Sequence, residues 1–284
     1  MGLLPISVIL VATALLLKTS WFPVFPGLGF WWYVAITFVL VMASTFSATL
    51  YLHRSLAHKS VTFVVWFEHV LRICIWLTTG MRRREWVAVH RKHHPFADRK
   101  EDPHTPAFQG VWHVVRYGLQ LYRKEAANPN TIATYAHDIP FDWIDRRLYH
   151  PFSNVGIFGI LPALYLLFFG SLPGFVIWIV QMFWFPYVVV GFVNAFSHSL
   201  GKKGFGFLSY RNHNTPDLSV NLWFWLFSFL TCGETNHNCH HAHPASAQIK
   251  CRRSEIDPGW WAIVLLKYLR IARDIKIAKC EYSE

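Results

Sequence analysis

The chain has 284 residues, of which 53% are hydrophobic, and its formal net charge at pH 7 is +11. An ordinary soluble domain has about 45–50% apolar residues, and here the apolar residues also gather in a few long runs. The composition therefore argues against a soluble protein. Nucleic-acid binding is not expected, because no recognition motif accompanies the basic charge.

Four apolar runs are predicted to cross a membrane, at about residues 3–25, 28–52, 152–169 and 172–197. The second run is the strongest, because it has no charged residue and exceeds the about 20 residues that a crossing requires. Aromatic residues at its start are typical of a membrane interface. A further apolar run at 61–80 contains Glu68 and Arg72, and it is predicted to be an interfacial helix.

The charged residues form two blocks. All sixteen Asp and Glu, and every Lys and Arg except Lys18, lie within residues 52–150 and 198–284. A basic excess beside membrane spans marks the cytoplasmic side. We therefore expect an all-α integral membrane protein, a single domain over 1–284, with about four transmembrane helices and both termini cytoplasmic. A helical cytoplasmic cap would comprise the blocks 53–151 and 198–284. The five cysteines form no C-x-x-C pair and are expected to stay reduced there.

Histidines cluster in three short motifs at the edges of the predicted spans. The motifs are HRSLAH from residue 53, HRKHH from residue 90 and HNCHH from residue 237, and His198 ends the last span. Positions i, i+3 and i+4 lie on one face of a helix, so the second and third motifs can each aim three imidazoles at one point. The five-residue gap in the first motif suits a place where a helix ends and the chain turns.

The number of imidazoles predicts two metal ions. Isolated histidines are usually surface residues, but three clustered motifs beside a membrane edge favour metal binding. Eight or nine imidazoles exceed what one ion can use, and zinc needs only about four ligands. Neutral nitrogen ligands suit iron, copper, nickel or zinc. The spacing alone therefore predicts a dinuclear site without identifying the metal.

The three motifs, in this order and with these spans between them, resemble those of the membrane fatty acid desaturase family, most closely its bacterial Δ9 acyl-CoA desaturase-like members. The resemblance covers about residues 28–261 and implies two iron ions with O₂ as co-substrate. The iron ligands that it implies are His53, His58, His90, His93, His94, His198, His237, His240 and His241. Asn194 would hold a water beside one iron. Residues that would support the ligands are Asp102, His104 and Glu234.

The resemblance implies that a cis double bond, at Δ9, is introduced into a saturated acyl chain. Animal acyl-CoA members place Arg-Asp directly before the second motif, whereas this chain has Ala88 and Val89. The acyl carrier therefore stays open between CoA, a phospholipid and a carrier protein. Candidate substrate contacts are Trp86, Arg82, Arg83, Arg84 and Lys92, of which the basic side chains can bind phosphates.

Each turnover of desaturation also requires two electrons from an external donor. The chain has no cytochrome-like segment, no C-x-x-C iron–sulfur motif and no convincing dinucleotide-binding loop. We therefore expect a ferredoxin- or cytochrome-type donor that is fed by an NAD(P)H reductase and docks on the basic face. The bacterial resemblance places the protein in an inner membrane, with the active site cytoplasmic.

The sequence leaves two alternative functions open. A membrane hydroxylase, ketolase or alkane monooxygenase can have the same iron core, and histidine spacing does not separate insertion of oxygen from removal of hydrogen. A metal-ion transporter is a more distant alternative. Polar groups near the bilayer centre are expected on an ion pathway, and the predicted spans contain no Asp, Glu, Lys or Arg apart from Lys18.

Overall fold

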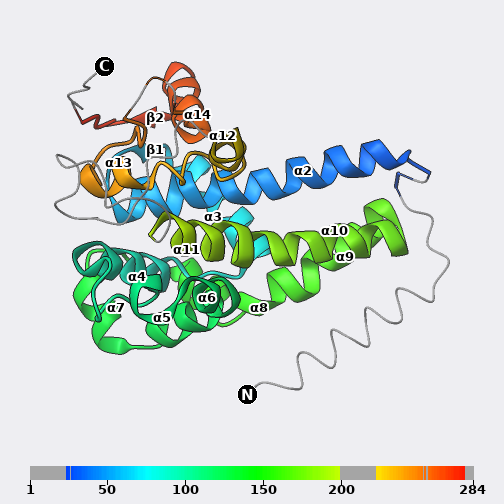
Figure 1. The fold of residues 1–284 in the computed structure, drawn as a ribbon. Coiled ribbons are helices and arrows are strands. Elements are labelled where there is room, and N and C mark those ends of the chain that lie inside the picture. Colours follow the sequence, from blue (N-terminus) through cyan, green and yellow to red (C-terminus); the bar gives the residue numbers. More distant parts are fainter. Residues whose placement is uncertain (1–23, 26, 199–221, 252, 254, 279–284) are drawn as a thin grey trace. The chain divides into compact units, whose positions relative to one another are not determined.

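A computed structural model describes residues 24, 25, 27–198, 222–251, 253 and 255–278. These residues are mostly helical, as predicted (Figure 1). The predicted span at 3–25 lies almost entirely outside the described residues. Among those described, the structure adds one element that the sequence did not predict, a short antiparallel ladder between β1 (Thr62–Phe63) and β2 (Ala272–Arg273).

The chain divides into two compact units. The first comprises residues 1–44, 73–82 and 141–185, and the second comprises 45–72, 83–140 and 186–284. The apolar run at 61–80 forms the helix α3 (Val65–Thr79), which contributes residues to both units. Its interfacial position stays a prediction.

The first unit is built on a helical hairpin. The hairpin consists of α9 (Leu161–Phe169) and α10 (Ser171–Phe183). The unit also contains η2 (Asp145–Tyr149), α8 (Ser153–Val155), η3 (Gly156–Ile160) and most of α2 (Phe30–Ser47). Helices α9 and α10 pack against each other around a core of Leu161, Tyr165 and Ile177. A Cβ atom at Gly174 would lie 2.4 Å from the carbonyl oxygen of Tyr165, so the close helix contact requires glycine.

Two described helices are long and apolar enough to cross a membrane, Phe30–Ala57 with 28 residues and Ser171–Ser197 with 27 residues. The first is α2 continued by the π-helical segment η1 (Ala48–Ala57), and the second joins α10 to η4 (Trp184–Phe192) and α11 (Val193–Ser197). They correspond to the predicted spans 28–52 and 172–197. The predicted span 152–169 is a shorter apolar helix, Ser153–Phe169. The total of four spans stays a prediction.

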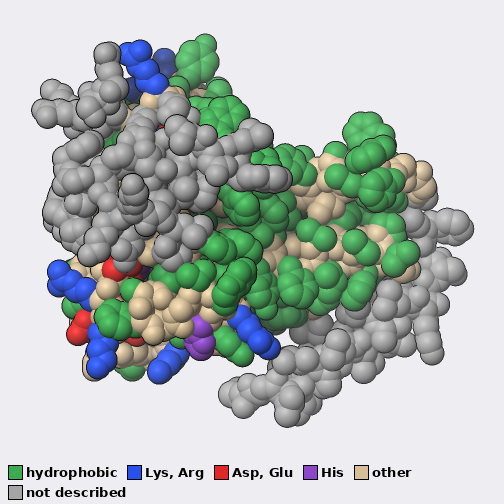
Figure 2. All heavy atoms as spheres, in the orientation of Figure 1, with side chains coloured by type: hydrophobic (Ala, Val, Ile, Leu, Met, Phe, Trp, Pro, Cys, Tyr) green, Lys and Arg blue, Asp and Glu red, His purple; other side chains and the backbone are tan. Residues whose placement is uncertain are grey.

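The surface of these helices is apolar. Exposed side chains on α9 and α10 include Phe168, Leu172, Phe175 and Phe183, and hydrophobic side chains cover this hairpin in Figure 2. Such an exterior suits contact with lipid rather than water.

The second unit carries the histidine motifs. Its described helices, besides η1, α11 and parts of α3 and η4, are α4 (Arg83–Phe96), α5 (Pro106–Gln109), α6 (Val111–Ala126), α7 (Pro129–Tyr135), α12 (Leu222–Leu230), α13 (His237–Ala242) and α14 (Pro258–Tyr268). Helix α4 packs against η1, α6 and α7, and α14 packs against η1. Ala57 of η1 and Val87 of α4 belong to one buried core cluster. This packing brings the first two histidine motifs together.

Candidate metal centre

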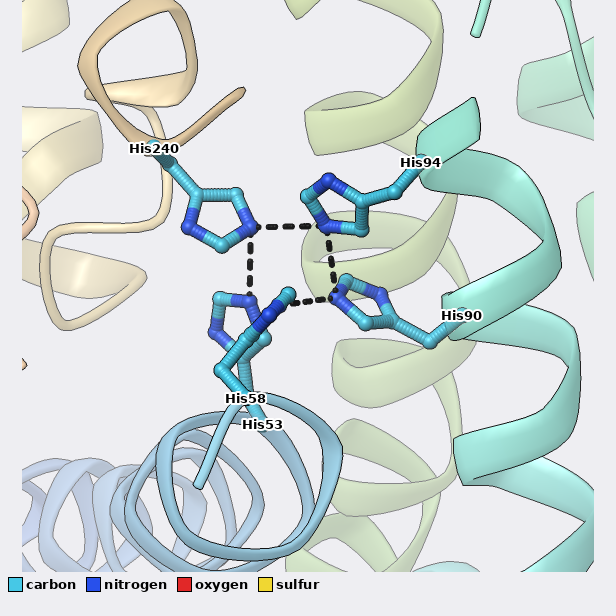
Figure 3. A group of neighbouring side chains, drawn as sticks. All are labelled: His53, His58, His90, His94 and His240. Atoms are coloured by element: carbon cyan, nitrogen blue, oxygen red, sulfur yellow. Dashed lines mark hydrogen bonds between the residues drawn. The ribbon is translucent and has the colours of Figure 1, made fainter. Parts of the chain in front are cut away.

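One group of five histidines converges from three elements of the second unit. His53 lies in η1 and His58 caps its end, His90 and His94 come from α4, and His240 comes from α13. Their potential ligand atoms all lie within 4.8 Å of one another, and the rings point toward a common centre (Figure 3).

The π-helical geometry of η1 explains how the first motif contributes both of its histidines. In an α-helix, residues five apart would point about 140° away from each other. Here the backbone N–H of His58 donates to the carbonyl of His53 at 3.1 Å, which is the i to i+5 bond of a wider turn. The two ring centroids lie 4.9 Å apart as a result. The predicted helix end at His58 is correct, and the wider turn supplies the shared face.

The nitrogen spacings in this group fit ligands of one ion. The Nε2 atoms of His58 and His90 lie 2.8 Å apart, those of His53 and His240 lie 3.0 Å apart, and those of His94 lie 3.1 Å from His90 and 3.0 Å from His240. Two nitrogens that bind one ion at about 2.1 Å and at right angles are about 3.0 Å apart.

A second group of four histidines lies beside the first. His93 of α4, His198 after α11, and His237 and His241 of α13 are all buried, and their ligand atoms also lie within 4.8 Å of one another. The Nε2 separations are 2.8 Å for His198 and His237, 3.0 Å for His237 and His241, and 3.2 Å for His93 and His241. The nine predicted histidines thus form a group of five and a group of four. The sequence neighbours His93 and His94 belong to different groups, and so do His240 and His241.

Carboxylates orient one histidine of the first group and two of the second through the opposite ring nitrogen. His53 Nδ1 lies 2.8 Å from Glu234, His93 Nδ1 lies 3.0 Å from Asp102, and His198 Nδ1 lies 3.1 Å from Asp98. A neutral imidazole that donates from Nδ1 presents a lone pair at Nε2. Glu234 and Asp102 were predicted to support the ligands, and Asp98 was not. Asp98 lies in the loop after α4, 100 residues before His198, so no local pattern indicated the contact.

The convergent lone pairs fit a cation. When the rings carry their protons on Nδ1, each Nε2 lone pair faces others of its kind, and a positive ion between them would relieve this repulsion. Burial lowers the pKa of His90, His94, His240 and His241 well below the usual value, so these rings stay neutral. Burial also lowers the pKa of His198 to about 3. The donor set is therefore neutral nitrogen, which suits iron and its neighbours among the transition metals.

The family model for fatty acid desaturases matches residues 7–253. The chain belongs to the fatty acid desaturase family. It is 34% identical over 258 residues to the sn-1 stearoyl-lipid 9-desaturase of Synechocystis sp., covering 89% of this chain and 74% of the relative. It is 29% identical to the Δ9 acyl-lipid desaturase 2 of Arabidopsis thaliana, covering 87% and 76%. It is also 30% identical to an acyl-CoA 5-desaturase of Anemone leveillei, covering 89% and 73%.

This membership makes the desaturase an oxidoreductase and a membrane protein, as predicted. The metal-ion transporter is thereby set aside.

Further predicted site residues pack against the clustered histidines of the desaturase. The His104 ring stacks on His93 with centroids 4.6 Å apart, and its backbone N–H donates to Asp102 at 3.1 Å. The indole of Trp86 stacks on His90 at 4.8 Å. Asn194 is half-buried in α11, one turn before His198. Its bond to a metal-bound water stays a prediction.

The basic substrate contacts predicted for the desaturase already have protein partners. Arg82 donates to the carbonyl of His150 at 3.0 Å, and Arg83 donates to the carbonyl of Pro140 at 2.7 Å. Lys92 pairs with Glu125 at 2.8 Å, and Arg84 is half-buried near the start of α4. Their binding of substrate stays a prediction.

The cysteines differ from expectation. Cys239, inside the third histidine motif, forms a disulfide with Cys251, although all thiols were predicted to be reduced. The residues that follow α13 return beside it, and this tertiary contact brings together two cysteines that are 12 residues apart. Such a spacing matches no redox motif, so the sequence did not indicate the pair.

Proposed function

We propose that this desaturase uses two iron ions and O₂ to introduce a cis Δ9 double bond into an acyl chain esterified in a membrane lipid. The observation that carries the proposal is the division of the nine histidines into a group of five and a group of four. Each group has nitrogen spacings suited to one ion. When bound, the two irons would supply the oxidising power that removes hydrogen from an unactivated methylene.

The residues of the chain prepare this site. Glu234, Asp102 and Asp98 hold ring protons at Nδ1, so that Nε2 is free to bind metal. Burial of six of the nine histidines limits the access of competing water, whereas His58, His90 and His94 are half-buried. The side chains of His93, His198, His240 and His241 are each 1% exposed.

The acyl carrier is proposed to be a lipid on the basis of the second histidine motif. Ala88 and Val89 take the place of the Arg-Asp pair of animal acyl-CoA members, and they are 0% and 2% exposed. Ala88 packs in the core cluster with Ala57, Ala136 and Ile139. These two positions therefore present no charged group to CoA. The names of two relatives also favour lipid substrates, whereas a third acts on acyl-CoA.

The test is expression of the full chain in a bacterial host without a desaturase of its own, beside a His241→Ala variant as the inactive control. We expect fatty acids two mass units lighter, with the double bond located at C9 by mass spectrometry after derivatisation. A gain of sixteen units would instead support the hydroxylase alternative. A double bond at another carbon would refute the Δ9 assignment alone.

The carrier is tested with the purified protein in vesicles that contain an NAD(P)H reductase and a ferredoxin- or cytochrome-type donor. Deuterated stearoyl chains are offered either within a phospholipid or as acyl-CoA. We expect conversion of the esterified chain without its release. Conversion of acyl-CoA alone would overturn the lipid assignment. The cytoplasmic orientation of the site is tested separately, by labelling single engineered cysteines from each side of the membrane.

A further inference from the structure

A buried ion pair joins the first histidine motif to a segment far along the chain. Arg54 lies next to His53 and is 1% exposed, and Asp257, 203 residues later, is 0% exposed. Burying a guanidinium and a carboxylate is costly unless both are paired and fully hydrogen-bonded. Several separate segments supply partners for both terminal nitrogens of Arg54 and for both oxygens of Asp257, whereas Arg54 Nε is buried without one among the described residues.

Arg54 uses both terminal nitrogens of its guanidinium. Nη2 donates to Asp257 Oδ1 at 2.6 Å and Nη1 donates to Oδ2 at 3.3 Å, which is a forked pair. Nη1 also donates to the carbonyl of Ala247 at 2.7 Å, and Nη2 donates to the carbonyl of Cys232 at 3.1 Å. One side chain of η1 therefore binds three segments of the C-terminal region.

The carboxylate of Asp257 also accepts two backbone hydrogen bonds. Its Oδ2 accepts from the backbone N–H of Ile249 at 2.9 Å, and its Oδ1 accepts from that of Trp260 at 2.9 Å, which caps the start of α14. Two glycines make room for the pair. A Cβ atom at Gly233 would lie 2.5 Å from Asp257 Oδ1, and one at Gly259 would lie 2.5 Å from Arg54 Nη2.

The turn that Arg54 binds leads directly into the third histidine motif. Two residues after Cys232, the carboxylate of Glu234 contacts His53 Nδ1 at 2.8 Å. The carbonyl of the same Glu234 lies 3.3 Å from His237 Nδ1. The bond from Arg54 to Cys232 therefore holds a turn whose next residues contact one histidine of the five-member group and one of the four-member group.

We infer that Arg54 and Asp257 are positioning residues that hold the first and third histidine motifs in register, without themselves touching metal or substrate. The inference deepens the proposed function and rests on it, since the histidines that are positioned are the proposed metal ligands. The pair can fix the position of the two motifs because its hydrogen bonds are directional. A forked charge pair with four backbone contacts fixes a position, whereas apolar packing of equal volume fills space without fixing it.

The test compares the native full chain with Asp257→Asn, Arg54→Lys and the apolar double variant Arg54→Met with Asp257→Leu. The control is Asp274→Asn, because Asp274 also links the C-terminal region to residue 62, through a 2.7 Å bond from Thr62 Oγ1 at the surface. The purified proteins are titrated with Co²⁺, whose visible absorption reports nitrogen coordination without requiring catalysis. Thermal unfolding is measured on the same samples.

We expect the native chain and the control to bind two Co²⁺ ions with identical spectra. The single variants should bind Co²⁺ at least about 10-fold more weakly, as is usual when support for metal ligands is lost. The double variant removes both buried charges, so it should unfold at a higher temperature than Asp257→Asn, which leaves the Arg54 charge unpaired, while its Co²⁺ binding stays weak. Recovery of native Co²⁺ binding by the double variant, or native binding by both single variants, would overturn the inference. Absence of Co²⁺ binding by the native chain would instead count against the proposed metal centre.

Discussion

His93 Nδ1 lies 3.0 Å from Asp102 Oδ1, and both side chains are buried. The same carboxylate accepts backbone N–H groups from His104 at 3.1 Å and Asp98 at 3.2 Å. Asp102 therefore fixes the ring orientation of His93 and also the conformation of the loop that follows α4. These contacts hold its pKa far below the usual range, despite burial that alone would raise it, with His93 as the main cause.

Replacement of Asp102 by Asn is expected to weaken iron binding about 10- to 100-fold. The amide removes the negative charge that favours the Nδ1–H form of His93. The backbone N–H groups of His104 and Asp98 bond to different oxygens of Asp102, and an NH₂ group in place of one oxygen accepts no hydrogen bond, so one donor loses its partner. Iron content after dialysis against a chelator measures the effect, and Asp274→Asn is the isosteric control at the surface. Retention of two irons by the variant would contradict this role of Asp102.

Replacement of Asp98 by Asn should act on one metal only. Asp98 contacts His198, which belongs to the group of four, and the described contacts of the group of five do not include it. We therefore expect iron content to fall from about two to about one per chain, because the second group has the smaller ligand set. Loss of both irons together would contradict this selectivity.

Much of the candidate site was predictable because histidine motifs at helical spacing are local signals. The i, i+3, i+4 pattern of His90, His93 and His94 predicted three convergent rings on α4. The structure brings all three into the site but divides them, with His90 and His94 in the group of five and His93 in the group of four. The spans predicted at 28–52 and 172–197 rest likewise on uncharged apolar runs, and both segments are helices long and apolar enough to cross a membrane.

The rest depended on contacts between residues far apart in the sequence. The wide turn of η1, which puts His53 and His58 on one face, has no recognised sequence signature. Asp257 pairs with Arg54 across 203 residues, and the disulfide of Cys239 forms only because the chain folds back. Local patterns specify which residues share a helix face, but they do not specify which distant segment covers it.

The metal-free protein should lose stability in acid, partly through His104. Burial, with His93 as the next cause, lowers the pKa of His104 from 6.5 to about 3. Between these values the unfolded chain binds a proton that the folded protein does not, so stability falls as the pH falls. The loss is about 1.4 kcal/mol per pH unit for each such histidine.

The measurement is thermal unfolding of the metal-free protein in detergent from about pH 7.5 to about pH 5.5. A His104→Phe variant keeps an aromatic ring against His93 and should show a shallower pH dependence than the native chain. Equal slopes for the two proteins would show that His104 is protonated in the folded state.

Single histidine replacements should separate the two groups. His58→Ala removes one of five imidazoles and leaves four, which suffice to hold a divalent ion. His241→Ala removes one of four and leaves three. We expect about two irons per chain in the first variant and about one in the second, with desaturation abolished in both because the ligand arrangement is altered. Elemental analysis of each purified protein, together with its fatty acid products, provides the comparison. The opposite order of iron loss would mean that the two groups do not act as separate metal sites.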